Sequence, residues 1–503
     1  MWYGLPSLGF WKKYLKVGPG DWQAATYLFF SQFAVPVVCV APLLAAGFPS
    51  SIIIYSFFPA FAWQHIVGHG YCTFAAVRLA AQKDRPAVTA LPGLGVDLVS
   101  SLTVTLGIML PLWQATGDPY RTWGVGLAVN LLFGMVKLIF LPFVQVLREI
   151  VPRASLLGLL GGLLLVYVGT TYGISAVQQP YVSFFALGVV LASMYGGWLK
   201  EFPVIPVVFV FGSVIGYWAG YSSVPSERIA FHFTFGQIVP LGLRYLRVAV
   251  LEHASLVVPL ALGNQLLRTL SNLESAEAVG DRYNVRELLL VDGAVTTIGG
   301  AFLGSWMPTF LLAGHPGWKE TGARTTYPAL TSAAYIGAGF TGLLWIARGI
   351  VPDGLVAGIF IWVALVVVEV AVKETPQKHL PAVFITFIPV GAYLITTQIA
   401  GLIDQVQGRF DNLQTLALGF PFTAVVWGTI VVHLVEQEPK KAAAWCAAGA
   451  AFTFVGLMHS SALQIGADSL PIVVGYLIWG VSTLIMYYLD RWYLKGWTDD
   501  PSP

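Results

Sequence analysis

Pro and Gly interrupt two apolar runs of this chain, at residues 89–95, TALPGLG, and at residues 307–317, MPTFLLAGHPG. A break of this kind frees backbone N–H and C=O groups, which hydrocarbon cannot satisfy. At membrane depth it is tolerated only where it lines a cavity or is buried in protein. Unless the two stretches are ordinary loops between complete helices, they predict broken helices whose ends meet around a binding site.

The composition places these breaks in a membrane protein. Hydrophobic residues make up 56% of the 503 and charged residues only 10%, whereas a soluble domain carries about 25% charge. At about 20 residues per span, the chain has room for about 14 to 16 helices. We therefore expect an all-α polytopic protein in the lipid bilayer, with no separate soluble domain. A net charge of +2 gives no reason to expect a nucleic-acid partner.

The apolar runs form two sets of seven and a final pair. An odd number of spans inverts the second set relative to the first, which is the architecture of an inverted repeat. The two breaks then fall in the third span of each set, which are spans three and ten. The predicted segments are a cytoplasmic N-terminal segment 1–24, a first repeat 25–221, an inter-repeat segment 222–254 with amphipathic character, a second repeat 255–436, and two extra C-terminal spans with a short tail, 437–503.

Lys and Arg concentrate in the loops of one side of the predicted membrane. When the N-terminus is placed inside, the inner loops hold most of them, for example Lys12, Arg78, Arg148, Arg282 and Lys441. This bias predicts a multi-pass protein of the inner or plasma membrane with both termini in the cytoplasm. The N-terminal segment lacks the features of a signal peptide, so we expect the first span to remain.

Ionisable residues inside the predicted spans are candidates for function. A carboxylate in the bilayer costs about 2.5–3.5 kcal/mol and persists when it is paired, hydrated or functional. Glu274 and Glu277 in the eighth span share one helix face, although Glu277 could equally be a solvated interfacial charge. Asp292 could pair with Arg268 or face the cavity, and Lys137 could pair with a carboxylate or reach the interface.

Two histidines in the second span are a further candidate pair. His65 and His69 are four residues apart, a spacing that could bind metal, but no third ligand is in view. A role in helix packing and a role in a proton relay are therefore both favoured over metal binding.

The residues around the breaks resemble a known family. The stretches 272–283 (NLESAEAVGDRY), 286–293 (RELLLVDG), 304–309 (GSWMPT) and 314–324 (GHPGWKETGAR) are similar to the eighth-to-tenth-span signature of xanthine/uracil permeases. Residues 89–93 (TALPG) resemble the third span of the purine permease branch. The resemblance implies a proton-coupled nucleobase symporter of the nucleobase–ascorbate transporter type, in which a core domain (spans 1–4 and 8–11) moves like an elevator against a gate domain. Homodimers are usual in that family.

The same resemblance implies a set of site residues. Glu274 would bind the base and couple transport to protons, although another alignment of the eighth span puts Asn272 at that acidic position. The substrate-binding residues carried over are Glu274, Asn272, Glu277, Thr89, Pro92, Gly93, Asp97, Pro308, Thr309, Phe310 and His315. No cofactor or metal is implied, and a proton or sodium gradient would drive transport.

Other functions remain open at this point. An anion transporter of the bicarbonate or sulfate type could use the same fold, but it would need a site poor in carboxylates. The acidic residues would also suit a guanidine-like cation. A membrane enzyme or a sensor would need clustered catalytic residues or a soluble output module, and the sequence shows neither.

Overall fold

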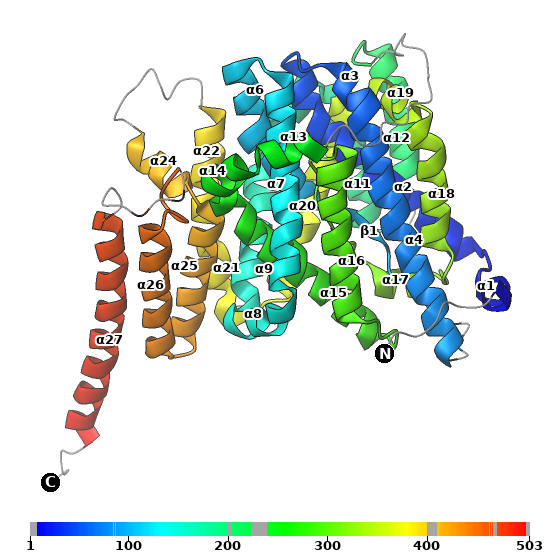
Figure 1. The fold of residues 1–503 in the computed structure, drawn as a ribbon. Helices are drawn as coiled ribbons and strands as arrows, with labels where there is room; N and C mark the ends of the chain where they lie inside the picture. The colour runs from blue at the N-terminus through cyan, green and yellow to red at the C-terminus, as the bar shows by residue number, and fades with distance from the viewer. Residues whose placement is uncertain are drawn as a thin grey trace. The chain divides into compact units, whose positions relative to one another are not determined.

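The computed structural model describes residues 8–83, 85, 87–198, 204–222, 239–399, 410–461, 463, 465 and 470–498. Almost all of them are helical (Figure 1). By length and apolar composition, eight described helices could cross a membrane, or nine if the bent pair α24 (Asp411–Ala417) and α25 (Phe420–Val435) is one span. The prediction of an all-α polytopic membrane protein is confirmed. The number is below the predicted sixteen because several apolar runs fold as shorter helices.

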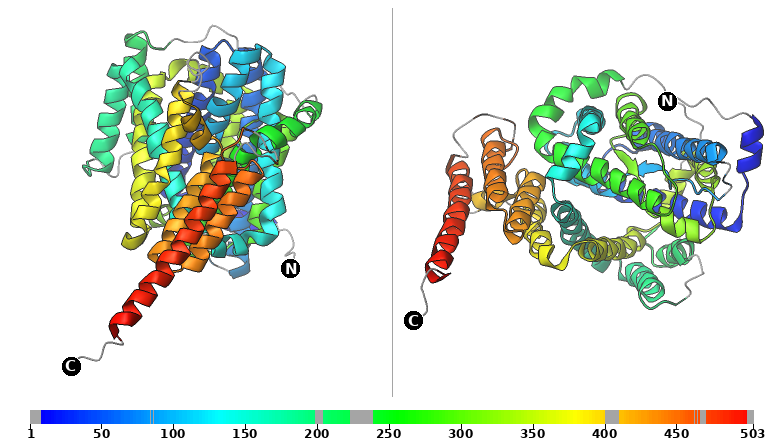
Figure 2. Two further views of the ribbon diagram at one scale, coloured as in Figure 1. Left: turned by 90° about the vertical axis from the view of Figure 1, so that its left-hand side faces the viewer. Right: turned by 90° about the horizontal axis from the view of Figure 1, so that it is seen from below.

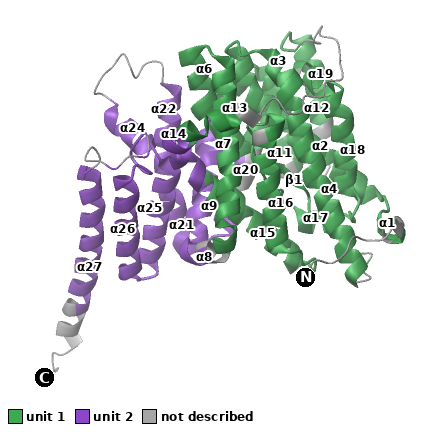
Figure 3. Ribbon diagram, in the orientation of Figure 1, with its two compact units in different colours: residues 1–144, 171–249, 260–362 green, residues 145–170, 250–259, 363–503 purple. Residues whose placement is uncertain are grey.

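The chain divides into two compact units, coloured separately in Figure 3. Unit 1 holds residues 1–144, 171–249 and 260–362, and unit 2 holds 145–170, 250–259 and 363–503. The predicted segments follow repeats rather than these units, and they stay a prediction. Residues 223–238 of the inter-repeat segment lie outside the described residues.

The N-terminal part of unit 1 surrounds the first break. Its elements are α1 (Leu8–Tyr14), α2 (Pro19–Ala45), α3 (Ser50–Ile52), η1 (Ile53–Phe57), α4 (Phe58–Lys83), β1 (Leu94–Val96), α5 (Leu98–Val104), η2 (Thr105–Met109), α6 (Leu110–Thr116), α7 (Pro119–Phe140) and η3 (Leu141–Phe143). Helices α5 to α6 run on as one helix from Leu98 to Thr116. This helix begins directly after the Pro92-Gly93 break, as expected.

The later part of unit 1 surrounds the second break. Here lie α10 (Thr170–Gln178), α11 (Pro180–Met194), α12 (Val204–Trp218), α13 (Val239–Arg244), α14 (Leu246–Pro259), η5 (Leu260–Leu267), α15 (Arg268–Ala278), α16 (Val285–Ile298), η6 (Gly299–Leu303), β2 (Thr309–Leu311), α17 (His315–Glu320), α18 (Tyr327–Phe340), α19 (Leu343–Ile350) and α20 (Asp353–Lys373). The ends of α10, α14 and α20 belong to unit 2. The short helix predicted after the second break is α17.

The two breaks meet in an antiparallel pair of strands. Leu94 pairs with Leu311, Gly95 with Phe310 and Val96 with Thr309. Further backbone bonds extend the pairing, from Asp97 N–H to Pro308 C=O (2.8 Å) and from Leu312 N–H to Gly93 C=O (3.0 Å). Backbone groups freed by the breaks are thus satisfied by each other, because buried polar groups need partners.

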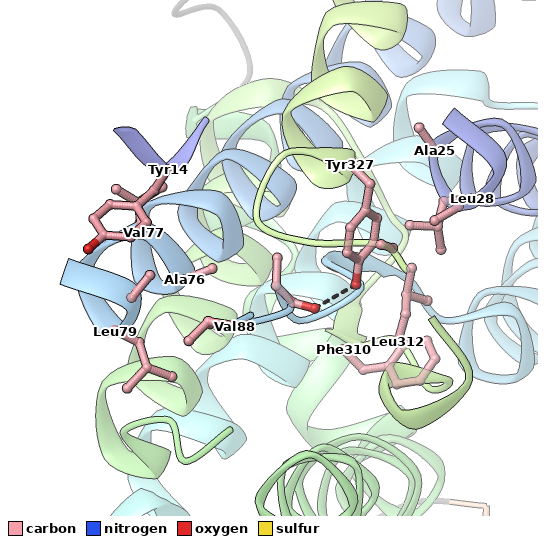
Figure 4. Packing of buried hydrophobic residues seen from close by; sticks show 14 residues of the cluster. Tyr14, Ala25, Leu28, Ala76, Val77, Leu79, Val88, Phe310, Leu312 and Tyr327 are labelled. Atoms are coloured by element: carbon pink, nitrogen blue, oxygen red, sulfur yellow. Dashed lines mark hydrogen bonds between the residues drawn. The ribbon is translucent and has the colours of Figure 1, made fainter. Parts of the chain in front are cut away.

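An aromatic and aliphatic cluster packs beside these strands (Figure 4). Phe310 and Leu312 belong to it, as does Tyr327 of α18. The Tyr327 hydroxyl donates to the Ala90 C=O at 2.6 Å, the bond dashed in Figure 4. The cluster therefore fixes the extended chain before β1 against α18.

Unit 2 is a helical bundle. It contains most of α8 (Val144–Ile150), then α9 (Arg153–Gly162), η4 (Leu163–Gly169), η7 (Gln377–His379), α21 (Leu380–Ile385), α22 (Phe387–Gln398), α24, α25, α26 (Pro439–Phe454) and α27 (Leu470–Thr498). Helices α25, α26 and α27 lie side by side (Figure 2). The last two are the predicted extra C-terminal helices.

Candidate functional site

Side chains from two helices hold the backbone that leads into β2. Asn130 of α7 donates its amide to the C=O groups of Ser305 (2.7 Å) and Met307 (3.2 Å). Gln64 of α4 also donates to Met307 C=O, at 2.9 Å. In an extended chain, the carbonyls of alternate residues point to the same side. The side-chain amides therefore bind the Ser305 and Met307 carbonyls in the place that a neighbouring strand would otherwise take.

A buried ion pair continues this support. Lys137, seven residues after Asn130 on α7, donates to Asp292 Oδ2 (2.9 Å), to Thr296 Oγ1 (2.8 Å) and to Thr309 C=O. Thr309 Oγ1 in turn donates to Asp292 Oδ1 at 2.8 Å. Lys137 and Asp292 are both buried. Of the open alternatives, Lys137 pairs with a carboxylate, and that carboxylate is Asp292.

A second polar cluster lies at the start of α5, around Asp97. Asp97 is buried and caps the N-terminus of α5, where its Oδ2 accepts from Ser100 N–H at 3.0 Å. The amide of Asn264 donates to the same oxygen. The amide of Gln265 donates to Ser100 Oγ at 3.1 Å. Two oxygens of this cluster, Asp97 Oδ1 and Gln265 Oε1, have no hydrogen-bond partner among the described residues.

The helix geometry explains how adjacent residues reach this cluster. Asn264 and Gln265 lie in η5, a stretch of π-helix between α14 and α15. A π-helical turn is wider than an α-helical one and is often found at functional sites. In η5 it lets two consecutive amides approach the start of α5.

Arg268 is the cation of this cluster. Its guanidinium carbon lies 4.6 Å from the centroid of the Phe310 ring, and its Nη1 donates to Asn264 Oδ1 at 3.4 Å. Asp97 and Arg268 attract each other electrostatically. No carboxylate among the described residues lies within ion-pair distance of the Arg268 guanidinium, so its remaining N–H groups can bind a ligand.

A third cluster ties the first break to α17. The buried Asp281 carboxylate accepts from Lys319 Nζ (2.7 Å), His315 Nε2 (3.1 Å) and Thr89 N–H (3.2 Å). His315 Nδ1 donates to Ala90 C=O at 3.0 Å. Burial by itself would raise the pKa of Asp281, but the hydrogen bonds from His315, Lys319 and Thr89 outweigh it, so the pKa lies below its usual value.

The predicted acidic pair of the eighth span, Glu274 and Glu277, lies on α15. Glu274 is half-buried on α15. Glu277 is half-exposed and pairs with Arg282 at 3.1 Å, as a solvated interfacial charge would. Asn272 donates to Leu311 C=O at 2.7 Å, so it supports β2.

The remaining predicted residues lie in the segments that lead into the two strands. Thr89, Pro92, Gly93 and Pro308 are all buried. Gly93 has φ +118°, and its missing Cβ leaves room for the ring of His69, which would lie 2.5 Å from such an atom. Only glycine fits this position without strain.

The histidine pair follows the helix-packing interpretation. His65 Nδ1 and His69 Nδ1 each bond the backbone C=O four residues earlier, at 2.9 and 3.0 Å. In the described part of the chain, no three His, Cys, Asp or Glu side chains are grouped as a metal site would require.

Sequence reasoning missed several residues that the fold brings together. Four buried polar residues in apolar spans were overlooked: Gln64, Ser100, Asn130 and Gln265. The only indication of their role in the sequence is that a polar side chain in an apolar span is unusual. Arg268 was considered as a partner of Asp292, but among the described residues Asp292 pairs with Lys137. The side-chain contacts of the four missed residues join positions more than a hundred apart in the chain.

Comparison with known proteins gives the fold. No protein-family model matches the chain, and no curated protein matches it. Among solved structures, the transmembrane domain of a cyanobacterium bicarbonate transporter, BicA, is similar at 12% identity with a TM-score of 0.51, over 76% of this chain and 97% of that one. SLC26A9 is similar at 11% identity with a TM-score of 0.54, over 85% of this chain and 66% of that one. The murine Slc26a9 anion transporter in the inward-facing state has 11% identity and a TM-score of 0.47, over 86% and 71%.

The predicted membership of the nucleobase permeases is wrong. The solved structures that this chain resembles include a bicarbonate transporter and SLC26A9, which are not nucleobase permeases. The short motifs around the breaks misled the assignment because Pro, Gly and acidic residues at these positions serve the architecture and not one substrate. The architecture itself is confirmed: this chain has the seven-plus-seven inverted-repeat fold, with core and gate domains, that it shares with BicA and SLC26A9.

Proposed function

We propose that this protein is a secondary active transporter that carries a small anion across the membrane. Two lines support the proposal. The first is the fold shared with a bicarbonate transporter. The second, which carries it, is Arg268: a half-buried guanidinium beside the strand pair, with no carboxylate partner among the described side chains.

An anion would complete the hydrogen bonding of Arg268. A guanidinium presents five N–H donors in a planar fork that matches carbonate, sulfate or carboxylate. The structure gives it one side-chain acceptor, Asn264 Oδ1. Holding a cation away from bulk water costs free energy unless an anion pairs with it. A guanidine-like substrate would instead be repelled by Arg268, which disfavours that alternative.

Asp97 gives this site a route to proton coupling. Its Oδ1 is buried beside the cluster and accepts no hydrogen bond from the described residues. A protonated Asp97 would present an O–H donor, and Arg268 would then be the only charge of the Asp97–Arg268 pair. An ionised Asp97 would compensate Arg268 and weaken anion binding. Binding of a proton and of an anion would thus favour each other.

The test is uptake into proteoliposomes containing the purified protein. Labelled bicarbonate, sulfate and chloride are compared with guanidinium, each with and without an inward proton gradient. We expect uptake of at least one anion and none of guanidinium. We expect Arg268→Gln to lower anion uptake at least about tenfold, because a charge-assisted hydrogen bond contributes about 1.5–3 kcal/mol.

Two control variants sharpen this test. Arg268→Lys keeps the charge and should retain part of the uptake. Arg121→Gln removes an exposed arginine at the start of α7 and should leave uptake unchanged. Wild-type uptake of guanidinium alone, or full anion uptake by Arg268→Gln, would contradict the proposal.

A further inference from the structure

A cavity of about 1130 Å³ lies in unit 1 between the end of α4, the start of α16 and η3. Neither the strands nor Arg268 line it, so it is separate from the proposed anion site. Its volume is slightly above the usual range of small-molecule pockets, which runs from about 300 to about 1,000 Å³. It therefore has room for a sizeable ligand.

The charged side chains that line the cavity have a net positive charge. Three arginines and two glutamates line it. Arg78 donates two hydrogen bonds to Glu287, at 2.8 and 2.7 Å, and Arg282 pairs with Glu277 at 3.1 Å. Arg286, also exposed, has no carboxylate within ion-pair distance among the described residues. The lining therefore carries one positive charge in excess, available to an anionic group.

Apolar side chains also line the cavity, and some of them are exposed. Leu79, Leu141 and Leu290 line it. Leu290 is 52% exposed, and Phe143, two residues after Leu141, is 55% exposed. Leu290 follows Arg286 by four residues on α16, so it lies on the same helix face about 6 Å further along the axis. A cation and an apolar side chain stacked in this way match a ligand with a charged head and an apolar body.

The charge distribution indicates the source of such a ligand. This end of unit 1 carries Arg78, Arg282, Arg286 and Lys319, which belong to the loops predicted to face the cytoplasm. The cytoplasmic leaflet holds anionic lipids, and each Lys or Arg near its surface contributes about 1 kcal/mol of attraction. An apolar rim of this kind is stable in a membrane where it contacts acyl chains.

We propose that this cavity binds an anionic phospholipid, with the phosphate at Arg286 and Arg282 and the acyl chains along Leu290 and Leu141. Arg78 is held by Glu287 and forms the wall of the headgroup site. Binding of the lipid does not depend on what the protein transports, so failure of the anion-transport proposal leaves it standing.

The test is lipid binding to the full-length protein in detergent, followed by native mass spectrometry and thermal unfolding. Phosphatidylglycerol, phosphatidylcholine with the same acyl chains, and inorganic phosphate are added separately. We expect phosphatidylglycerol to be retained and to raise the unfolding temperature, and phosphatidylcholine and phosphate to do neither. Arg286→Gln should weaken the apparent affinity for phosphatidylglycerol about fivefold, the fold-change that corresponds to about 1 kcal/mol.

Matched variants separate the headgroup contact from general effects. Arg286→Lys keeps the charge and should stay within about twofold of wild type, since lipid attraction follows charge. Arg121→Gln, outside the cavity, should bind as wild type does. Leu290→Asn should weaken lipid binding with the arginines intact. Equal retention of both lipids, binding of phosphate alone as tight as that of the lipid, or an unchanged affinity in Arg286→Gln would overturn the proposal.

Discussion

The two polar clusters next to the strand pair differ in how many of their polar atoms have hydrogen-bond partners. In the cluster of Lys137, Asp292, Thr296 and Thr309, every charged atom has partners and the two charges cancel. In the cluster of Asp97, Asn264, Gln265 and Arg268, two oxygens lack partners among the described residues and the guanidinium has no ion pair. A satisfied buried network rigidifies a fold, whereas an incomplete one is costly unless a ligand completes it. We therefore infer that the first cluster stabilises the strand pair and that the second cluster binds the transported anion.

The largest effect should follow from breaking the satisfied cluster. Lys137→Met leaves Asp292 as an uncompensated buried carboxylate, which should lower the free energy of unfolding by about 3–5 kcal/mol. Thermal and denaturant unfolding in detergent measure the loss. The double variant Lys137→Met/Asp292→Asn removes both charges and should recover part of it. Wild-type stability in the single variant would show that the pair does not support the strands.

The stability of the protein should be almost as sensitive to a change at the start of the strand pair. Gly93→Ala adds a Cβ at φ +118° and against the His69 ring, which should cost about 2–4 kcal/mol through backbone strain and overpacking. Gly70→Ala on α4 is the matched control, because its added Cβ meets no atom within 4 Å. We expect that control to stay within about 1 kcal/mol of wild type. Equal stabilities for the two variants would contradict the close approach at Gly93.

A smaller effect should appear at the Asp281 cluster, and it should depend on pH. Asp281→Asn removes charge-assisted hydrogen bonds from Lys319 and His315 and should cost about 1.5–3 kcal/mol at neutral pH. Because folding lowers the pKa of Asp281, its contribution is complete above the unfolded value of about 3.9 and is lost as the pH falls through the folded value. The difference in unfolding temperature between wild type and variant should therefore shrink below about pH 4. If the difference in unfolding temperature grew as the pH fell, the predicted direction of the pH dependence would be wrong.

The smallest effect on stability, but a clear effect on transport, is expected in the incomplete cluster. Asp97→Asn retains an N-cap oxygen for α5 and should change the free energy of unfolding by less than about 1 kcal/mol. Anion uptake in proteoliposomes should lose its response to an inward proton gradient, because the variant cannot titrate. The sequence assigned coupling to Glu274, so Glu274→Gln belongs in the same assay. If only Glu274→Gln removed the response, coupling through Asp97 would be excluded.

Much of the fold could be predicted from local sequence. Hydropathy and the shortage of charge predict membrane helices because hydrocarbon accepts little else. Pro92, Gly93 and Pro308 predict the two breaks because they cannot continue a helix. Asp97 follows the first break within a few residues, and it is the N-cap of α5. These features depend on residues close together in the chain.

The site could be predicted only in part. The carboxylates of α15 were singled out for being acidic in a span, yet Glu277 is half-exposed and paired with Arg282. Asp292 could have paired with Arg268, and only the packing of α7 against α16 gives it Lys137 instead. Short Pro- and Gly-rich motifs also suggested the wrong family, because they indicate where a helix breaks and do not indicate which ligand is bound.

By itself the sequence determined that this chain fills a membrane with helices, where two of them break, and that the breaks belong to inverted repeats. These properties follow from the local free energy of burying side chains and backbone in hydrocarbon. Only the tertiary structure decided which polar residues meet, because pairs such as Lys137–Asp292 and Asp97–Asn264 join residues 155 and 167 positions apart. Whether a buried charge is balanced depends on those distant partners, so the difference between the supporting cluster and the binding cluster appears only in three dimensions.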